Sequence, residues 1–302
     1  MTSTSEREAF RREPYTTGMV TSRDGTVIGY RLLGRGPSVV LVHGGMSSGY
    51  NHLEMAEAMA DAFTIYLPDR RGRGLSGPAA IDDNLNTDVE DIDALLSATG
   101  AHYIFGLSSG AIICLEAALR LPAVHKAAIF EPPLFIADPA TPPATLLRFD
   151  REMAKGDVAA ALITAMKAAQ MGPPILNLLP RRLLELLTRL LMKAEDKKPP
   201  VGYESTRILA ATMHHDFQLV VEIAGRVERF REIRGEVLLL GGSKSPRFCR
   251  VDLGAMEKVV PHAHRVEFSG LGHAASWNRD RGGTPGPVAQ ELKRFFDETG
   301  RR

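Results

Sequence analysis

The chain has 302 residues, of which 44% are hydrophobic and 24% charged, which is enough for one large domain with an ample core. A formal net charge of +1 gives no electrostatic reason to expect nucleic acid or an anionic membrane as the main partner. Two cysteines without metal or CxxC spacing, and the lack of any apolar stretch of transmembrane length, argue against a disulfide scaffold and a membrane-spanning protein.

The first part of the chain alternates short β-rich runs with helical patterns. Residues 1–14 are polar and hold no apolar run of signal-peptide length, so we expect a polar N-terminal extension and a cytoplasmic protein. The patterns that follow predict strands over 26–33, 38–43, 63–68, 102–105 and 126–130, and helices over 51–62, 88–99 and 109–121. Such alternation is typical of an α/β fold with a mostly parallel sheet covered by helices on both faces.

The pattern changes between residues 137 and 231, where no convincing strand occurs. Helices are predicted there over 145–154, 158–169, 181–193 and 206–214. Strands return over 236–240 and 264–268, and a last helix is predicted over 287–297. We therefore expect a core made of residues 15–136 and 232–302, with an all-helical insertion, or cap, over residues 137–231.

Residues 106–110, Gly-Leu-Ser-Ser-Gly, fit the pattern G-x-S-x-G between a predicted strand and a predicted helix. A serine held in a strained strand-to-helix turn crowds the neighbouring backbone, so the positions two before and two after it must be small. Gly106 and Gly110 meet that need. Ser108 is then a candidate nucleophile, and the backbone N–H of Ser109 would point at the oxyanion of the reaction. The alternative interpretation is an ordinary glycine-rich turn of an α/β sheet.

Three further motifs follow predicted strands: His43-Gly44-Gly45, the loop 69–77 (DRRGRGLSG) and Gly270-Leu271-Gly272-His273. In this order, together with G-x-S-x-G, they resemble the α/β-hydrolase superfamily over about residues 25–298. The exception is the helical insertion, which itself resembles that family's cap. The resemblance implies an eight-stranded sheet with the catalytic motif at its carboxyl edge.

The resemblance also implies roles for individual residues. Ser108 would be the nucleophile and His273 the base. The backbone N–H of Gly45 or Met46, together with that of Ser109, would form the oxyanion hole. His43 would support its own loop, and the arginines of the loop 69–77 would face solvent.

The acid of the expected Ser-His-acid triad is missing from its usual place. Residues 240–246 read LGGSKSP, with no carboxylate before Asp252. Glu131 ends the predicted strand 126–130 at the same sheet edge, and neighbouring strands lie only about 4.8 Å apart. Some α/β-hydrolases, including lactonases that open resorcylic macrolactones, are similar in drawing their acid from this position. We predict Glu131 as the acid, with a solvated strand-end glutamate as the alternative. Asp252 and Asp216, interpreted as helix-start or surface residues, are the fallbacks.

These assignments predict a serine hydrolase that cleaves a carboxylic ester or lactone through an acyl-enzyme. The cap is rich in leucine and methionine, so we expect a small to medium apolar substrate as the partner. Hydrolysis of a C–C bond at the same site and a non-catalytic ligand-binding protein on this fold stay open as alternatives. We expect no cofactor and no metal, since the pair His214–His215 lacks a third ligand at recognisable spacing. Nucleic acid and membrane partners are not expected, and a homodimer stays open.

Overall fold

The computed structural model describes residues 14–170, 172 and 178–297. The predicted N-terminal extension, residues 1–14, lies outside the described residues except for Pro14. The strands are β1 (Thr16–Thr21), β2 (Val27–Gly34), β3 (Ser38–Val42), β4 (Thr64–Pro68), β5 (Tyr103–Leu107), β6 (Lys126–Phe130), β7 (Glu236–Gly242) and β8 (His264–Phe268).

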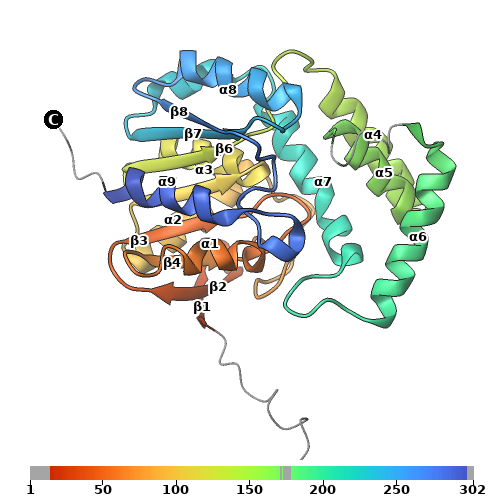
Figure 1. Cartoon of the computed structure of the whole chain (residues 1–302), viewed down its shortest axis with the longest axis horizontal. Coiled ribbons are helices and arrows are strands. Elements are labelled where there is room, and N and C mark those ends of the chain that lie inside the picture. Colours follow the sequence, from red (N-terminus) through yellow and green to blue (C-terminus); the bar gives the residue numbers. More distant parts are fainter. Residues whose placement is uncertain (1–13, 171, 173–177, 298–302) are drawn as a thin grey trace, which may run out of the picture.

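These strands form one sheet in the order β1-β2-β4-β3-β5-β6-β7-β8 (Figure 1). β2 runs antiparallel to both β1 and β4, and every other neighbouring pair is parallel. The expected fold class, a mostly parallel eight-stranded sheet with helices, is confirmed. The carboxyl ends of β3, β5, β6, β7 and β8 therefore meet at one edge, where the predicted catalytic motifs follow.

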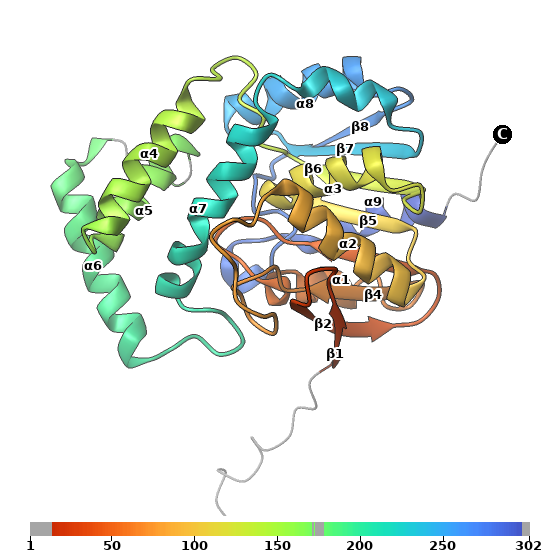
Figure 2. The same cartoon turned by 180° about the vertical axis from the view of Figure 1, so that it is seen from behind.

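Helices cover both faces of the sheet, as predicted. They are α1 (Leu53–Glu57), α2 (Leu85–Thr99), α3 (Ser109–Arg120), α4 (Thr141–Ala154), α5 (Val158–Ala168), α6 (Arg181–Lys197), α7 (Thr206–Ile223), α8 (Arg247–Val259) and α9 (Pro285–Asp297). α1 and α9 pack in one hydrophobic cluster, and α2, α3, α8 and the end of α7 pack in the other (Figures 1 and 2).

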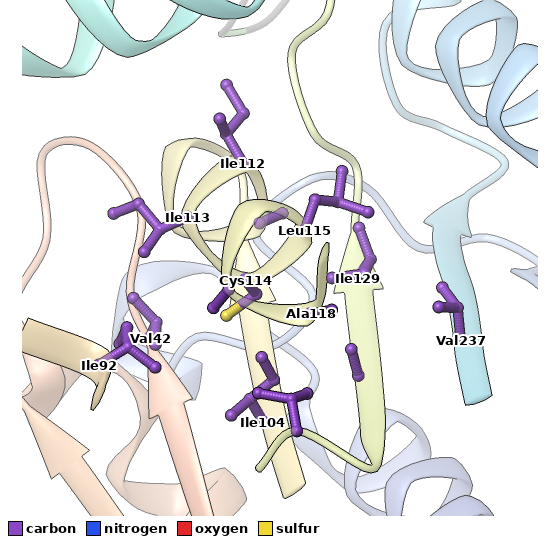
Figure 3. Packing of buried hydrophobic residues seen from close by; sticks show 14 of the residues in the cluster. Val42, Ile92, Ile104, Ile112, Ile113, Cys114, Leu115, Ala118, Ile129 and Val237 are labelled. Carbon is purple, nitrogen blue, oxygen red and sulfur yellow. The ribbon is translucent and has the colours of Figure 1, made fainter. Parts of the chain in front are cut away.

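Helix α3 lies in the centre of the second cluster. Its residues 109–118 are all buried, which explains why the sequence there is apolar or small at nearly every position. Figure 3 shows side chains of α3 among those of β3, β5, β6 and β7. Cys114 is fully buried in this packing, and burial raises the pKa of its thiol. The helix that carries the candidate nucleophile is thus fixed on all sides.

Helices α4 to α7 lie between β6 and β7 in the chain, in the part predicted to be all-helical. In both overall views α7 stands between the sheet and α4 to α6 (Figures 1 and 2). None of the helices that the structure describes combines the length and the apolar composition needed to cross a bilayer.

Several predicted boundaries are wrong, each for a local reason. The helix predicted over 145–154 begins at Thr141, because Pro142 and Pro143 occupy the first turn, where a missing N–H breaks no intrahelical bond. The helix predicted over 206–214 continues to Ile223. The predictions stopped at the polar run of residues 214–216, which lies inside the helix because these side chains pair with charged groups of other elements.

Other elements were missed or overextended. Strand β1 and helix α8 were not predicted. The helix predicted over 51–62 is divided into a 3₁₀ turn (Gly49–His52) and a short helix that ends at Glu57. The helix predicted from 88 begins earlier, at Leu85, because the Asn84 side chain accepts a hydrogen bond from the Asn86 N–H.

Asp252 corrects the interpretation of that residue as a helix-start or surface group. It lies in the first half of α8 and is fully buried. Its carboxylate accepts hydrogen bonds from the backbone N–H groups of Leu134, Phe135 and Ile136 at 2.9, 2.9 and 3.0 Å. Asp252 thus holds the segment that leaves β6 just after Glu131, and it is not available as a triad acid.

We therefore expect Asp252→Ala to lower the free energy of unfolding by about 1–3 kcal/mol, because one buried and two partly buried N–H groups lose their acceptor. Val251→Ala, at the exposed neighbouring position of the same helix, is the matched control and should change stability much less. Urea denaturation measures both changes. Equal midpoints for the two variants would contradict this role of Asp252.

Candidate active site

Ser108 occupies a strained turn between β5 and α3. Its φ of 56° and ψ of −124° lie outside the regions that L-residues favour, and its N–H donates to the Phe130 carbonyl at 2.9 Å. The strain is maintained because β5 and the fully packed α3 fix both sides of the turn. This geometry matches the serine in a strained strand-to-helix turn that the sequence predicts.

The two glycines around Ser108 are required by close backbone approach. A Cβ on Gly106 would lie 2.3 Å from the Gly110 carbonyl oxygen, and a Cβ on Gly110 would lie 2.5 Å from the carbonyl oxygens of Val42 and His43. The turn is therefore pressed against the end of β3. Only residues without a side chain fit at these two positions.

Glu131 directly follows β6 and is fully buried. Its Oε2 lies 2.6 Å from Nδ1 of His273. Because a carboxylate only accepts hydrogen bonds, Nδ1 carries the proton in this contact, and Nε2 is left as an acceptor. Glu131 has a φ of 45°, and the φ angles of Ser108 and Met46 are positive as well. Three of the six described non-glycine residues with positive φ are thus predicted site residues, which is where backbone strain tends to gather.

The Glu131 side chain reaches past β7 to contact the loop that follows β8. Its Oε1 accepts a hydrogen bond from the N–H of Gly242 at 2.7 Å. A Cβ on Gly241 would lie 3.1 Å from the same oxygen. The sequence Gly241-Gly242 therefore leaves room for the carboxylate, and its backbone binds it, at the end of the strand after which the resemblance implies an aspartate.

The loop after β3 is built around neutral His43. Burial, followed by the charges of Arg73 and Arg70, holds the pKa of His43 well below its ordinary value. Its Nδ1 contacts the Gly44 carbonyl at 2.9 Å, and its Nε2 accepts the Arg70 N–H at 3.0 Å. His43 thus ties this loop to the loop 69–77, in agreement with its predicted supporting role.

The arginines of the loop 69–77 do not face solvent, so that expectation is wrong. Arg70, Arg71 and Arg73 are 7%, 7% and 2% exposed. Arg71 pairs with a set of carboxylates made of Asp24, Asp83 and Asp91. Arg70 and Arg73 instead turn toward the inserted helix α7.

Asp216 of α7 is the partner of both arginines and is itself buried, which corrects its interpretation as a helix-start or surface residue. It accepts from Arg70 at 2.7 Å, from Arg73 at 2.6 Å and from the Ser109 hydroxyl at 2.7 Å. Burial opposes ionisation, but Arg73 and Arg70 outweigh it and hold the pKa of Asp216 below its ordinary value. Asp216 is therefore an ionised group bound on all sides.

This cluster contacts both parts of the predicted oxyanion hole. Asp216 binds the side chain of Ser109, whose N–H is one predicted donor. Arg73 donates to the Gly44 carbonyl at 2.8 Å, next to Gly45, the other predicted donor. This role of Asp216 was not predicted from the sequence. The one available signal was a histidine pair followed by an aspartate inside an otherwise apolar helical pattern.

A cavity of about 90 Å³ joins the predicted residues. Gly45, Ser108, Ser109 and His273 line it together with Asp216. Its other walls are mainly apolar and include Pro133, Phe135, Pro142, Met213, Phe217, Val220 and Phe248.

Two of the predicted site residues, Met46 and Glu131, do not line this cavity. Met46 follows Gly45 in the chain, and Glu131 lies behind His273 and contacts its ring. No hydrogen bond joins Ser108 to His273 among the described residues. Such catalytic contacts are often long in an unliganded enzyme and shorten when the substrate binds.

Glu131, His273 and Cys249 also bring three possible metal-ligand atoms within 4.8 Å of one another. The chemistry of this group does not favour a metal. Burial and the neighbouring Glu131 carboxylate raise the pKa of the Cys249 thiol, whereas a metal binds the thiolate. The Glu131–His273 distance of 2.6 Å is that of a hydrogen bond and is shorter than the separation of two ligands on one ion.

Comparison with known proteins agrees with this fold. Residues 39–290 match the family model described as "Alpha/beta hydrolase family". A crystal structure of an alpha/beta hydrolase from Sphaerobacter thermophilus is 28% identical, with a TM-score of 0.75, and the alignment covers 92% of this chain and all of that one.

Curated relatives match over shorter stretches. The "Pimeloyl-[acyl-carrier protein] methyl ester esterase" of Stenotrophomonas maltophilia is 34% identical over 127 residues, which are 40% of this chain and 48% of the relative. The "Uncharacterized hydrolase YraK" of Bacillus subtilis is 35% identical over 113 residues, which are 36% of this chain and 42% of the relative. The chain thus spans less than half the length of these relatives.

We expect Asp216→Asn to lower the free energy of unfolding by about 3–5 kcal/mol, because two buried arginines lose their counter-charge. Asp150→Asn is the matched control. Asp150 of α4 pairs at 2.8 Å with His214, which lies in α7 as Asp216 does, but both side chains of this pair are more than a third exposed. That pair should contribute at most about 1 kcal/mol. Urea denaturation measures the free energy of unfolding of both variants. Equal losses in the two would contradict the assignment of Asp216.

Proposed function

Because the chain belongs to the alpha/beta hydrolase family, we propose that it is a serine hydrolase that cleaves a carboxylic ester or lactone through an acyl-enzyme intermediate. The observation that carries the proposal is the 2.6 Å contact between Glu131 and His273, at a cavity that also contains the strained Ser108. This contact supplies the carboxylate whose usual position in the sequence is empty.

In the proposed reaction, Nε2 of His273 takes the proton of Ser108 as the Ser108 oxygen attacks the carbonyl carbon. The Glu131 carboxylate stabilises the imidazolium that forms and holds the ring in one tautomer. The N–H groups of Ser109 and of Gly45 or Met46 donate to the oxyanion. His273 then protonates the leaving alcohol, and a water molecule activated by the same ring releases the acid from Ser108.

Two cavities indicate where the acyl group and the leaving alcohol of a substrate would bind. We assign the acyl group to the cavity of about 90 Å³, whose size favours a small acyl group and whose phenylalanine, methionine and proline walls favour an apolar one. His273 also lines a second cavity of about 310 Å³, which includes Lys244 and has room for the leaving alcohol. Asp216 adds no accessible charge to the first cavity, because Arg70, Arg73 and Ser109 already bind it.

The curated esterase relative supports ester hydrolysis over the stretch that it shares with this chain. Hydrolysis of a C–C bond at the same residues is the alternative within the family, and identification of the products separates it from ester hydrolysis. A non-catalytic binding protein was suggested mainly by the missing aspartate. The buried Glu131 in contact with His273 weakens that suggestion.

We expect Ser108→Ala to lower kcat for short activated esters by at least about 10⁴-fold, because the covalent step is lost. A fluorophosphonate probe should label the wild-type protein once and leave this variant unlabelled. Ser97→Ala, which changes an exposed serine of α2, is the control and should keep both activity and labelling. Near wild-type turnover by Ser108→Ala would refute the nucleophile assignment.

We expect Glu131→Gln to lower kcat by about 10³–10⁴-fold with a much smaller change in KM, because the amide keeps the shape but not the charge that stabilises protonated His273. Glu236→Gln, at the exposed start of β7, is the control and should leave kcat unchanged. Steady-state kinetics on one ester measures both. A loss below tenfold in Glu131→Gln would exclude Glu131 as the acid, whatever the nature of the nucleophile.

A further inference from the structure

Helix α6 exposes a row of leucines to solvent. Leu183, Leu186, Leu187, Leu190 and Leu191 are 40, 49, 42, 54 and 71% exposed. The spacing of three and four residues places them along one face of the helix. Of its two buried apolar residues, Met192 lies opposite this face and Leu184 lies at its edge, next to Leu191. On its buried side α6 packs against α5 and α7.

The position of α6 leaves this leucine face open. In both overall views the helix lies at the outer edge of the molecule, beyond α5 and away from the sheet (Figures 1 and 2). Leu178 just before the helix and Val201 just after it are also exposed, at 81% and 89%. Monomeric proteins rarely expose so many large apolar side chains together, and such patches mark interaction sites.

Cations flank the leucine face. At 100° per residue, Arg182, Lys193 and Lys197 lie along one of its borders, and Lys198 follows directly at the end of the helix. All four are exposed, and none forms an ion pair with a carboxylate of the described chain.

The acidic residues of α6 are already bound to other groups of the chain. Glu185 pairs with Arg181, Glu195 accepts the N–H of Thr206, and Asp196 pairs with Arg207. Apart from the partly exposed Arg189, which is itself paired, the surface around the leucines thus carries unneutralised positive charge.

This charge distribution distinguishes between two possible occupants of the face. In an antiparallel pair of α6 helices from two copies, like flanks meet, so the lysine border of one copy would face the lysine border of the other. An anionic lipid surface instead accepts leucine side chains at the acyl boundary and pairs its head groups with the cations. We propose that the leucine face of α6 binds the surface of a membrane that contains anionic phospholipid.

The experiment measures co-flotation of the full chain with vesicles of phosphatidylcholine that contain about one-third phosphatidylglycerol, and with vesicles of phosphatidylcholine alone. We expect binding to the anionic vesicles that weakens as salt is raised toward about 1 M, where the Debye length falls to about 3 Å. Binding to the neutral vesicles should be at least tenfold weaker. Equal binding to both kinds of vesicle, or to neither, would overturn the proposal.

Two variants test the residues. Leu186→Gln with Leu190→Gln should abolish flotation, and Lys193→Gln with Lys197→Gln should weaken it by about fivefold per lysine. Met19→Gln, which changes a 70% exposed residue of β1, is the matched control and should float like the wild type. Circular dichroism and hydrolysis of a water-soluble ester should be unchanged in all three, which separates this surface from the catalytic site.

Sedimentation at the same protein concentration tests the competing occupant. A wild-type dimer that Leu186→Gln with Leu190→Gln converts to a monomer would assign the face to a second copy, and the membrane proposal would fail. A monomer in both cases, together with anion-dependent flotation of the wild type, supports it.

Discussion

The site depends on one carboxylate that crosses a strand. Glu131 ends β6, yet its contact at 2.6 Å is with His273 in the loop after β8, so the side chain must reach past β7. That path is open because Gly241 has no side chain and because the N–H of Gly242 binds the carboxylate at 2.7 Å. A parallel sheet with strands about 4.8 Å apart allows this shift of the acid by one strand. The order of the strands is therefore the constraint that the proposed chemistry depends on.

A second constraint joins the inserted helices to that site. Asp216 of α7 is bound by Arg70 and Arg73 from the loop after β4 and by the hydroxyl of Ser109. A buried charge with partners removed is costly, so α7 cannot leave this position without exposing or replacing three charges. The helix that forms one wall of the apolar cavity is thereby held to the backbone that is proposed to bind the oxyanion. In the proposed function, substrate selection and oxyanion stabilisation would therefore share one set of contacts.

Whole-chain averages conceal the most unusual surface of the molecule. A net charge of +1 suggests no electrostatic partner, and the leucines of the predicted cap suggest an apolar substrate. In the structure the acidic side chains of α6 are used in local pairs, while its leucines and several of its cations point outward. The separation of paired acidic side chains from exposed leucines and cations within α6, rather than the net charge of the chain, therefore determines what this surface attracts.

The sequence by itself determined the features that depend on neighbouring residues. The glycines of residues 106–110 predict the strained turn of Ser108, and the apolar runs predict seven of the eight strands. Both predictions succeed because local sterics and periodicity act over a few positions. The prediction of Glu131 needed its place at the end of a predicted strand together with the resemblance to α/β-hydrolases, which implied where the acid was missing. Tertiary structure alone decided that Asp216 and Asp252 are buried acceptors rather than surface groups. Asp216 meets Arg70 across 146 residues of chain, and no local pattern encodes a charge pair that forms only when distant segments fold together.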